Sequence, residues 1–147
     1  MQMKLTFLAA ACAAVLSLSA CGGGGGSDAP AVAVASPASL VKTDTVVGTG
    51  AEATASSTVL VHYTGWVYDD KAVGFKGRQF DTSGGTAREF PLTGVVAGFA
   101  QGIAGMKVGG KRTILIPGSL GYPNGNPGAG IPPGAGLVFD VELVAVR

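Results

Sequence analysis

The sequence predicts an antiparallel α+β domain, in which several strands surround a single short helix. From Leu137 to Leu143 every second residue is apolar, and Asp140 and Glu142 stand between them. This period-two pattern is typical of a half-buried strand. Other short apolar runs end at glycine or proline turn signals, which indicates further strands. A single segment, Phe99–Met106, has apolar residues at helical spacing.

The first half of the predicted domain consists of strands and turns. Residues Val59, Val61 and Tyr63 alternate with other residues and are expected on one side of a long strand. The segments expected in order are a strand at 42–47, a turn at 48–50, a strand at 59–68, a polar excursion at 69–77, a strand at 78–83, a turn at 84–86 and a short extended run at 89–92.

One short helix is predicted next, because Phe99, Ile103 and Met106 fall at positions i, i+4 and i+7. The glycines at 98, 102 and 105 each weaken it by up to ~1 kcal/mol relative to alanine. The helix therefore depends on packing against the sheet. A strand at 111–116, a loop rich in Gly and Pro at 120–136 and the final strand complete the domain.

Composition excludes several classes of function. The chain has 147 residues, ten basic and nine acidic, with a net charge of +1. It is long enough for one modest domain, and nothing in it indicates a nucleic-acid interface or a polybasic membrane patch. His62 is the only histidine, and no catalytic triad or metal cluster can be assembled around it. We expect no metal, no cofactor and a passive surface position for His62.

Residues 1–20 have the features of a targeting segment. Lys4 precedes an apolar run, Leu5–Leu18, that is too short to span a bilayer comfortably. The sequence Leu18-Ser19-Ala20-Cys21 resembles the bacterial lipobox, which implies cleavage before Cys21 and lipid attachment to that residue. The alternative is an ordinary signal peptide that leaves Cys21 free. Gly22 stands where lipoproteins retained at the inner membrane carry aspartate, so the outer membrane is expected, with the domain in the periplasm or at the surface.

Residues 21–39 are predicted to form a tether, because five glycines are followed by an Ala, Val, Pro and Ser segment without periodicity. A phosphate-binding loop is the alternative for the glycines. No strand precedes them and no Lys-Ser or Lys-Thr pair follows, so the tether is the favoured interpretation. The folded domain is expected at 40–147.

Several motifs of the domain occur in the order and near the spacing of one family. They are Val61-His62-Tyr63-Thr64-Gly65, Phe80-Asp81-Thr82-Ser83, Phe90-Pro91-Leu92, the segment from Gly102 to Arg112, Leu120-Gly121-Tyr122 and Ile131-Pro132-Pro133. Together they resemble the FKBP-type peptidyl-prolyl cis-trans isomerases over about 40–147. The resemblance implies an antiparallel sheet of five to six strands wrapped around one short helix, with an apolar pocket between them.

The resemblance also implies the residues of that pocket. The expected catalytic residues are Asp81, Phe99 and Tyr122. The expected substrate-binding residues are Tyr63, Phe80, Phe90, Val95, Val96, Ile131 and Phe139. Phe99 would form the floor, Tyr122 and Ile131 the rim, and Asp81 would orient the substrate carbonyl region or accept a hydrogen bond from Tyr63. Without the resemblance, the four phenylalanines would be read as core packing and Asp81 as a turn cap.

Two positions depart from the family pattern. Arg88 stands where many members carry a pocket aromatic, and Phe99 stands where the best-known members have tryptophan. The segments on either side of Phe90 are also shorter than usual. These departures bear more on macrolide affinity than on isomerase activity.

The function implied is rotation of X-Pro bonds in folding proteins of the bacterial envelope, without covalent chemistry. The expected partners are proline-containing proteins or peptides and, through the family, macrolides such as tacrolimus or rapamycin. A monomer anchored to a membrane by its lipid is expected. The alternatives are a catalytically weak lipoprotein that binds proline peptides as a holdase, and a structural lipoprotein in which the domain is a spacer.

Overall fold

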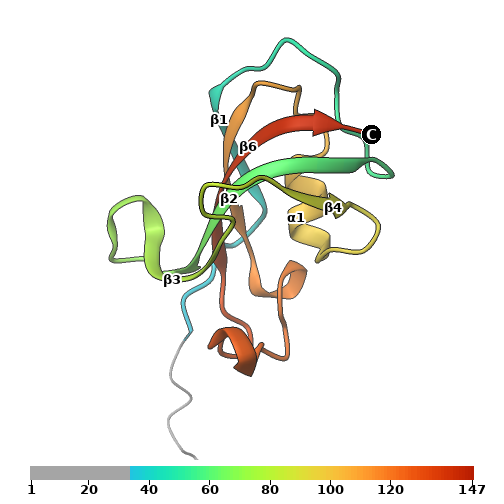
Figure 1. Cartoon of the computed structure of the whole chain (residues 1–147). Helices are drawn as coiled ribbons and strands as arrows, with labels where there is room; N and C mark the ends of the chain where they lie inside the picture. Colours follow the sequence, from blue (N-terminus) through green and yellow to red (C-terminus); the bar gives the residue numbers. More distant parts are fainter. Residues whose placement is uncertain (1–33) are drawn as a thin grey trace, which may run out of the picture. The chain divides into compact units, whose positions relative to one another are not determined.

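The computed structural model describes residues 34–147, so the predictions on the targeting segment, on Cys21 and on most of the tether lie outside the described residues. Six strands form one antiparallel sheet with the order β1-β5-β6-β2-β3, and β4 pairs with β2 (Figure 1). The strands are β1 (Val41–Val46), β2 (Thr58–Tyr68), β3 (Lys76–Thr82), β4 (Arg88–Pro91), β5 (Lys111–Ile116) and β6 (Leu137–Val146).

The helices are α1 (Ala97–Ile103) and three single 3-10 turns, η1 (Val73–Phe75), η2 (Gly118–Leu120) and η3 (Pro127–Ala129). The predicted α+β fold, a six-stranded antiparallel sheet with one short helix, is therefore confirmed. Within residues 34–147 no helix combines the length and the apolar composition that crossing a bilayer requires.

Strands β2 and β6 form the centre of the sheet, and their alternation sorts side chains to two faces. Leu137, Phe139, Val141 and Leu143 are at most 6 % exposed, as the period-two pattern predicts. On β2, Val59, Val61 and Tyr63 are buried on the same face. Val138 is also fully buried, although it belongs to the other face of β6. Figure 1 shows α1 on one side of the sheet, and the buried side chains of the core lie between the two.

The helix is shorter than its apolar pattern predicts. Helix α1 ends at Ile103, and Ala104 already has non-helical backbone angles, with φ −53° and ψ 130°. Gly105 then adopts a φ of +88°, in the region that favours glycine, and turns the chain out of the helix. Met106 is buried in the core, 2 % exposed, but it reaches the core from this turn. The prediction that Met106 lies on the helix is therefore wrong.

Two glycines let α1 lie directly against β5. A Cβ atom at Gly98 would lie 2.3 Å from Cγ2 of Ile116, and one at Gly102 would lie 2.6 Å from Cδ1 of Ile114. Neither position has room for a methyl group. The glycines that lower helix propensity are thus the residues that allow close packing, and burial of Phe99 and Ile103 offsets the lost propensity.

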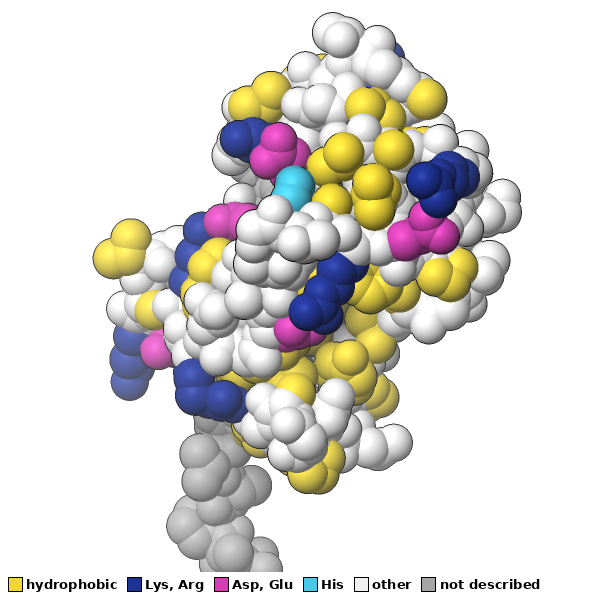
Figure 2. All heavy atoms as spheres, viewed as in Figure 1, with side chains coloured by type: hydrophobic (Ala, Val, Ile, Leu, Met, Phe, Trp, Pro, Cys, Tyr) yellow, Lys and Arg dark blue, Asp and Glu magenta, His cyan; other side chains and the backbone are white. Residues whose placement is uncertain are grey.

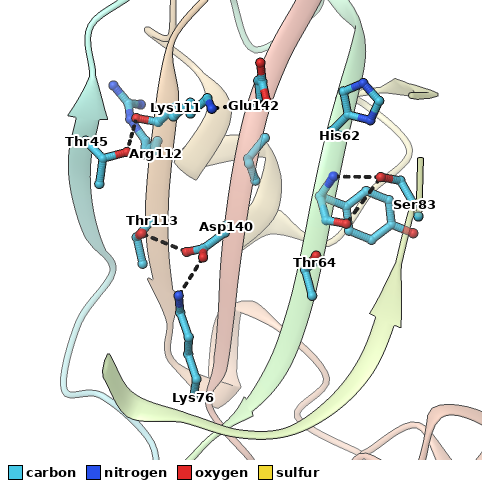
Figure 3. A pocket seen from close by; sticks show the side chains of 13 residues that line it. Thr45, His62, Thr64, Lys76, Ser83, Lys111, Arg112, Thr113, Asp140 and Glu142 are labelled. Carbon is cyan, nitrogen blue, oxygen red and sulfur yellow. Dashed lines mark hydrogen bonds and ion pairs between the residues drawn. The ribbon is translucent and has the colours of Figure 1, made fainter. Parts of the chain in front are cut away.

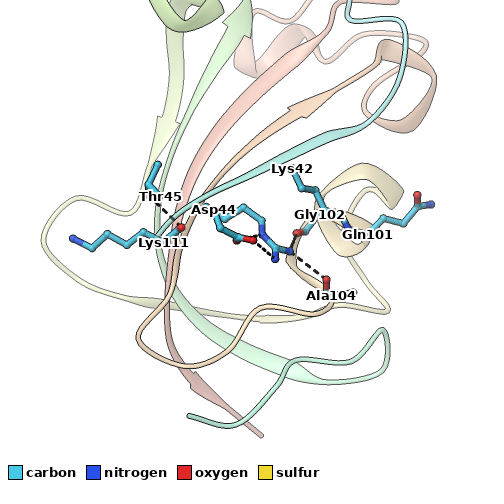
Figure 4. A network of polar contacts seen from close by, with 8 residues as sticks. Lys42, Asp44, Thr45, Gln101, Gly102, Ala104 and Lys111 are labelled. Atoms are coloured by element: carbon cyan, nitrogen blue, oxygen red, sulfur yellow. Dashed lines mark hydrogen bonds and ion pairs between the residues drawn. The ribbon is translucent and has the colours of Figure 1, made fainter. Parts of the chain in front are cut away.

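Arg112 on β5 contacts both β1 and the end of α1, and Figure 4 labels its partners Asp44, Gly102 and Ala104. Its side chain on β5 is 9 % exposed and forms a bidentate ion pair with Asp44 on β1, with Nε 2.6 Å from Oδ1 and Nη2 3.2 Å from Oδ2. Nη1 donates to the carbonyl oxygens of Gly102, at 2.8 Å, and Ala104, at 3.3 Å. The guanidinium therefore satisfies carbonyl groups that the helix end leaves without partners.

The segment before β1 lies along the loop 118–136, which contains η2 and η3 and joins β5 to β6. Gly136 donates its N–H to the carbonyl of Ala35 at 3.0 Å. Gly118 donates its N–H to the hydroxyl of Ser36, also at 3.0 Å. Residues that the sequence assigns to the tether thus hydrogen-bond to both ends of the loop 118–136.

Candidate active site

An apolar cavity of about 420 Å³ lies between the sheet and the N-terminal end of α1. Its lining residues are Tyr63, Phe80, Asp81, Phe90, Gly94, Val95, Val96, Phe99, Tyr122 and Phe139. The structure thus brings together all the predicted pocket residues except Ile131. The sequence did not point to Gly94, which enters the lining because its N–H closes a turn onto the carbonyl of Pro91.

Aromatic rings from β2, β3, β4, α1, β6 and the loop after β5 form the walls and floor of the cavity. The ring centroid of Tyr63 lies 5.5 Å from that of Phe90, 6.2 Å from that of Phe99 and 6.3 Å from that of Phe139. Phe99 and Phe139 are 5.1 Å apart in an edge-to-face arrangement. Edge-to-face contacts are a favourable aromatic geometry, so the rings fix one another in place. Phe99, 5 % exposed, lies at the base of this cluster.

Gly65 makes room for two of these rings. A Cβ atom at this position on β2 would lie 2.8 Å from both Phe80 and Phe139. The two phenylalanines contact each other edge-to-face at 5.5 Å across the glycine. The Gly65 of the sequence motif therefore shapes the wall of the cavity.

Tyr63 and Asp81 form the polar pair of the cavity. The Tyr63 hydroxyl donates to Oδ2 of Asp81 at 2.6 Å, while Oδ1 of Asp81 accepts the backbone N–H of Thr82 at 2.8 Å. Burial, and then the hydrogen bond and charge of Asp81, raise the pKa of Tyr63 to about 12. The phenol therefore stays protonated at neutral pH and keeps donating to Asp81.

Ser83 fixes the position of this pair. Its hydroxyl accepts the N–H of Tyr63 at 3.0 Å, and its own N–H donates to the carbonyl of Tyr63 at 2.9 Å. The side chain is 8 % exposed. Sequence reasoning placed Ser83 in a motif but gave it no role, because its partner is 20 residues away along the chain.

Tyr122 and Ile131 take different places on the loop between β5 and β6. Tyr122 is half-buried and lines the cavity, and its hydroxyl has no hydrogen-bond partner within residues 34–147. Ile131 is 2 % exposed and does not line the cavity. It forms a two-way backbone bridge with Asn126, with N–O distances of 2.8 and 2.9 Å. Its side chain anchors the loop that carries Tyr122, since it packs into the core.

The opposite face of the sheet has a polar hollow of about 350 Å³, shown in Figure 3. Asp140 accepts from Lys76 at 2.6 Å and from the Thr113 hydroxyl at 2.8 Å, and Lys111 lies 3.7 Å from Glu142. His62 lines this hollow, on the face of β2 away from Tyr63. Among the described residues, no three His, Cys, Asp or Glu side chains gather as a metal site. The hollow is thus a surface of paired charges.

Known proteins with similar sequences belong to the family that the motifs of the cavity resemble. A family model described as FKBP-type peptidyl-prolyl cis-trans isomerase matches residues 50–144. A probable FK506-binding protein of Corynebacterium glutamicum is 42% identical over 113 residues, which are 75% of this chain and 89% of the relative. The FK506-binding protein of Neisseria meningitidis serogroup A is 40% identical over 114 residues, 74% of this chain and 96% of the relative.

Solved structures agree as well. The crystal structure of a peptidyl-prolyl cis-trans isomerase from Pseudomonas syringae pv. tomato superposes with a TM-score of 0.64 at 31% identity, over 74% of this chain and 75% of the other. Fold, cavity and sequence lead to one conclusion: the chain belongs to the FKBP-type peptidyl-prolyl cis-trans isomerase family.

Proposed function

We propose that this isomerase domain rotates X-Pro bonds in proteins of the bacterial envelope, to which a lipid on Cys21 attaches it. The observation that supports catalysis best is the cavity of about 420 Å³, which aromatic side chains line and at whose edge Tyr63 donates a hydrogen bond to Asp81. It suits a proline ring, which is compact and apolar. Rotation of an amide requires no nucleophile, so the cavity needs none.

The cavity would lower the barrier by its polarity and its shape. Twisting an X-Pro amide costs ~18–20 kcal/mol because resonance is lost. The planar amide is the more charge-separated form, so an apolar cavity destabilises it relative to the twisted form. Phe99 and the surrounding rings would hold the proline while the preceding carbonyl turns. The Tyr122 hydroxyl would donate to that carbonyl.

The Tyr63–Asp81 pair would set the polar edge of the site. Asp81 is exposed, and its carboxylate is held by Tyr63 and by the Thr82 N–H. A carboxylate fixed in this way orients the substrate carbonyl region electrostatically and cannot collapse into the cavity. Tyr63 thus acts through Asp81 and through its ring.

A catalytically weak proline-peptide binder or holdase is the second candidate. Arg88 and the shortened segments around Phe90 favour it, because they change the side of the cavity that faces β4. Such a protein would bind the same peptides and leave their exchange rate unchanged.

The deciding experiment is NMR exchange spectroscopy of an X-Pro tetrapeptide with residues 22–147, the chain that lipoprotein processing would leave without its acylated cysteine. We expect faster cis–trans exchange, with a loss of about tenfold in Phe99→Ala and in Tyr122→Ala and a smaller loss in Tyr122→Phe. Near-ultraviolet circular dichroism checks that each variant is folded. Peptide resonances that shift at an unchanged exchange rate would favour the holdase.

The membrane anchor is supported by the lipobox-like sequence Leu18-Ser19-Ala20-Cys21 and by the apolar run before it. Two or more acyl chains on one residue anchor a protein durably, unlike a single chain. We expect labelled palmitate to be incorporated into the full chain and the protein to sediment with outer membranes. Cys21→Ala should abolish both. Tacrolimus or rapamycin, if they enter the cavity, should inhibit exchange competitively with the peptide.

A further inference from the structure

We propose that Arg88, on β4 beside the cavity, binds an acidic side chain next to the substrate proline and makes the isomerase selective for such sequences. The proposal deepens the proposed function and rests on it. The substrate class is an X-Pro segment with Glu or Asp directly before or directly after the proline.

Strand pairing places Arg88 on the face of the sheet that bears the cavity. On β4, Arg88 pairs with Val61 and Phe90 pairs with Val59. Residues directly opposite each other in an antiparallel pair project to the same face. Val59 and Val61 are fully buried on the core face, and Phe90 lines the cavity. Arg88, two residues before Phe90, therefore projects to the same side.

The guanidinium lies next to the polar pair of the site. Val61 is two residues from Tyr63 on β2, so Arg88 is a diagonal neighbour of Tyr63. Its charge and a hydrogen-bonding interaction act to lower the pKa of the Tyr63 phenol, against the larger effects of burial and Asp81. Arg88 is thus close to the Tyr63 hydroxyl, although its own side chain is exposed.

Arg88 forms no ion pair within residues 34–147. The two oxygens of Asp81 accept from Tyr63 and Thr82, and Glu89, which projects to the other face of β4, pairs with Arg147. The carboxylates of Asp81 and Glu89 therefore have other partners. On the side of the molecule drawn in Figure 2, some basic side chains lie beside hydrophobic ones.

A guanidinium in this position favours a carboxylate as partner. It stays charged at any physiological pH and can donate two parallel hydrogen bonds to a carboxylate. The one charged residue of the cavity lining is Asp81, which by itself repels an acidic substrate and attracts a basic one. A preference for acidic substrates would therefore come from Arg88, which lies beside this lining. Exposed ion pairs are weak, so we expect discrimination of about two- to fivefold.

The test compares kcat/KM for peptides with Glu, Gln or Lys directly before the proline, and for a second set with these residues directly after it, by NMR exchange with residues 22–147. In at least one set the parent should prefer Glu over Gln by about two- to fivefold. Arg88→Gln should abolish this preference and Arg88→Glu should invert it toward Lys. Lys71→Gln, which removes one positive charge from an exposed site outside the cavity, should leave it unchanged.

Salt separates charge recognition from shape, since screening weakens an exposed ion pair. The Glu-to-Gln ratio should fall toward one at high ionic strength in the parent and stay constant in Arg88→Gln. The proposal is overturned if the parent shows no Glu preference in either set, or if Arg88→Gln slows all peptides equally, which would make Arg88 a support for Tyr63. A parent that accelerates no peptide would instead refute the isomerase function itself.

Discussion

Tyr63 joins the apolar and the polar parts of the site in one side chain. Its ring contacts Phe90, Phe99 and Phe139, and its hydroxyl holds Asp81 at 2.6 Å. Removing the hydroxyl oxygen of Tyr63 would separate the contribution of its ring contacts from that of its hydrogen bond to Asp81.

Tyr63→Phe should keep the cavity and release Asp81. The ring contacts remain, while the lost hydrogen bond frees the carboxylate to rotate toward water. We expect kcat/KM to fall about three- to tenfold, the loss that corresponds to about one hydrogen bond. NMR exchange of a neutral X-Pro peptide measures the change. Tyr68→Phe, on the same strand but stacked on Phe75 outside the cavity, is the matched control. Equal activity of Tyr63→Phe and the parent would remove Asp81 orientation from the mechanism.

At the scale of elements, the packing of α1 on β5 determines how the floor of the cavity is held. Gly98 precedes Phe99, and the helix touches Ile116 at that point. A change in this contact should therefore reach the floor residue directly.

Gly98→Ala should destabilise the domain although alanine favours helices. The added methyl group would lie 2.3 Å from Cγ2 of Ile116, and overpacking of this kind costs about 1–3 kcal/mol. The gain in helix propensity is at most ~1 kcal/mol. We expect a lower midpoint of urea unfolding and lower activity through a displaced Phe99. Gln101→Ala, on the exposed side of the same helix, should change stability by only a few tenths of a kcal/mol. A stabilised Gly98→Ala variant would contradict the close approach.

The Asp44–Arg112 ion pair should make the stability of the domain depend on pH in the acid range. The hydrogen bond and charge of Arg112 lower the pKa of Asp44 below 3.8. A carboxyl whose pKa is lower in the folded state stabilises it above the unfolded pKa and loses this contribution as the pH falls through the folded value. The stability difference between the parent and Asp44→Asn should thus be largest near neutral pH and shrink below pH 3.8. Urea unfolding across this range measures it, and a constant difference would contradict the linkage.

The sequence predicted most elements because their patterns are local. The alternation in β6 and the Pro-Gly signal after β5 define their strands within a few residues. The end of α1 was mispredicted because Met106 keeps helical spacing after Gly105 has already turned the chain. Helical spacing alone cannot show whether Met106 lies on the helix or reaches the same side of the core from the turn that follows it.

The residues of the site, in contrast, could be predicted only from the family motifs. Its aromatic residues come from β2, β3, β4, α1, β6 and the loop after β5, and strand pairing between distant segments brings most of them together. No local pattern reports that pairing, so the family motifs supplied it. Ile131 matches the motif yet packs into the core, and the direction of Arg88 follows from a register that the sequence does not contain.

At the scale of the whole molecule, the two faces of the sheet differ in chemistry. One face bears the aromatic cavity, and the other bears charges that neutralise one another. The segment before β1 lies along the loop 118–136, between whose ends Tyr122 stands.

Removing residues up to Pro37 should therefore weaken the site as well as the fold. A chain that begins at residue 38 loses the hydrogen bonds from Gly136 and Gly118 to Ala35 and Ser36. We expect a loss of about 1–2 kcal/mol in stability and faster amide exchange in the loop 118–136. The chain 34–147 is the matched control. Unchanged exchange in this loop would show that the segment is dispensable.

The same attachment has a mechanical consequence if Cys21 holds the domain to a membrane as we propose. A client that moves away from the membrane would then pull on the domain at residue 34, where the described part of the chain begins. The pull would load the bonds of Ala35 and Ser36 to Gly136 and Gly118 before it reaches the sheet. Tension would thus displace the Tyr122 loop and speed dissociation of the client, and a force-clamp measurement should then show a shorter peptide dwell time. The membrane anchor would in this way promote release of the substrate.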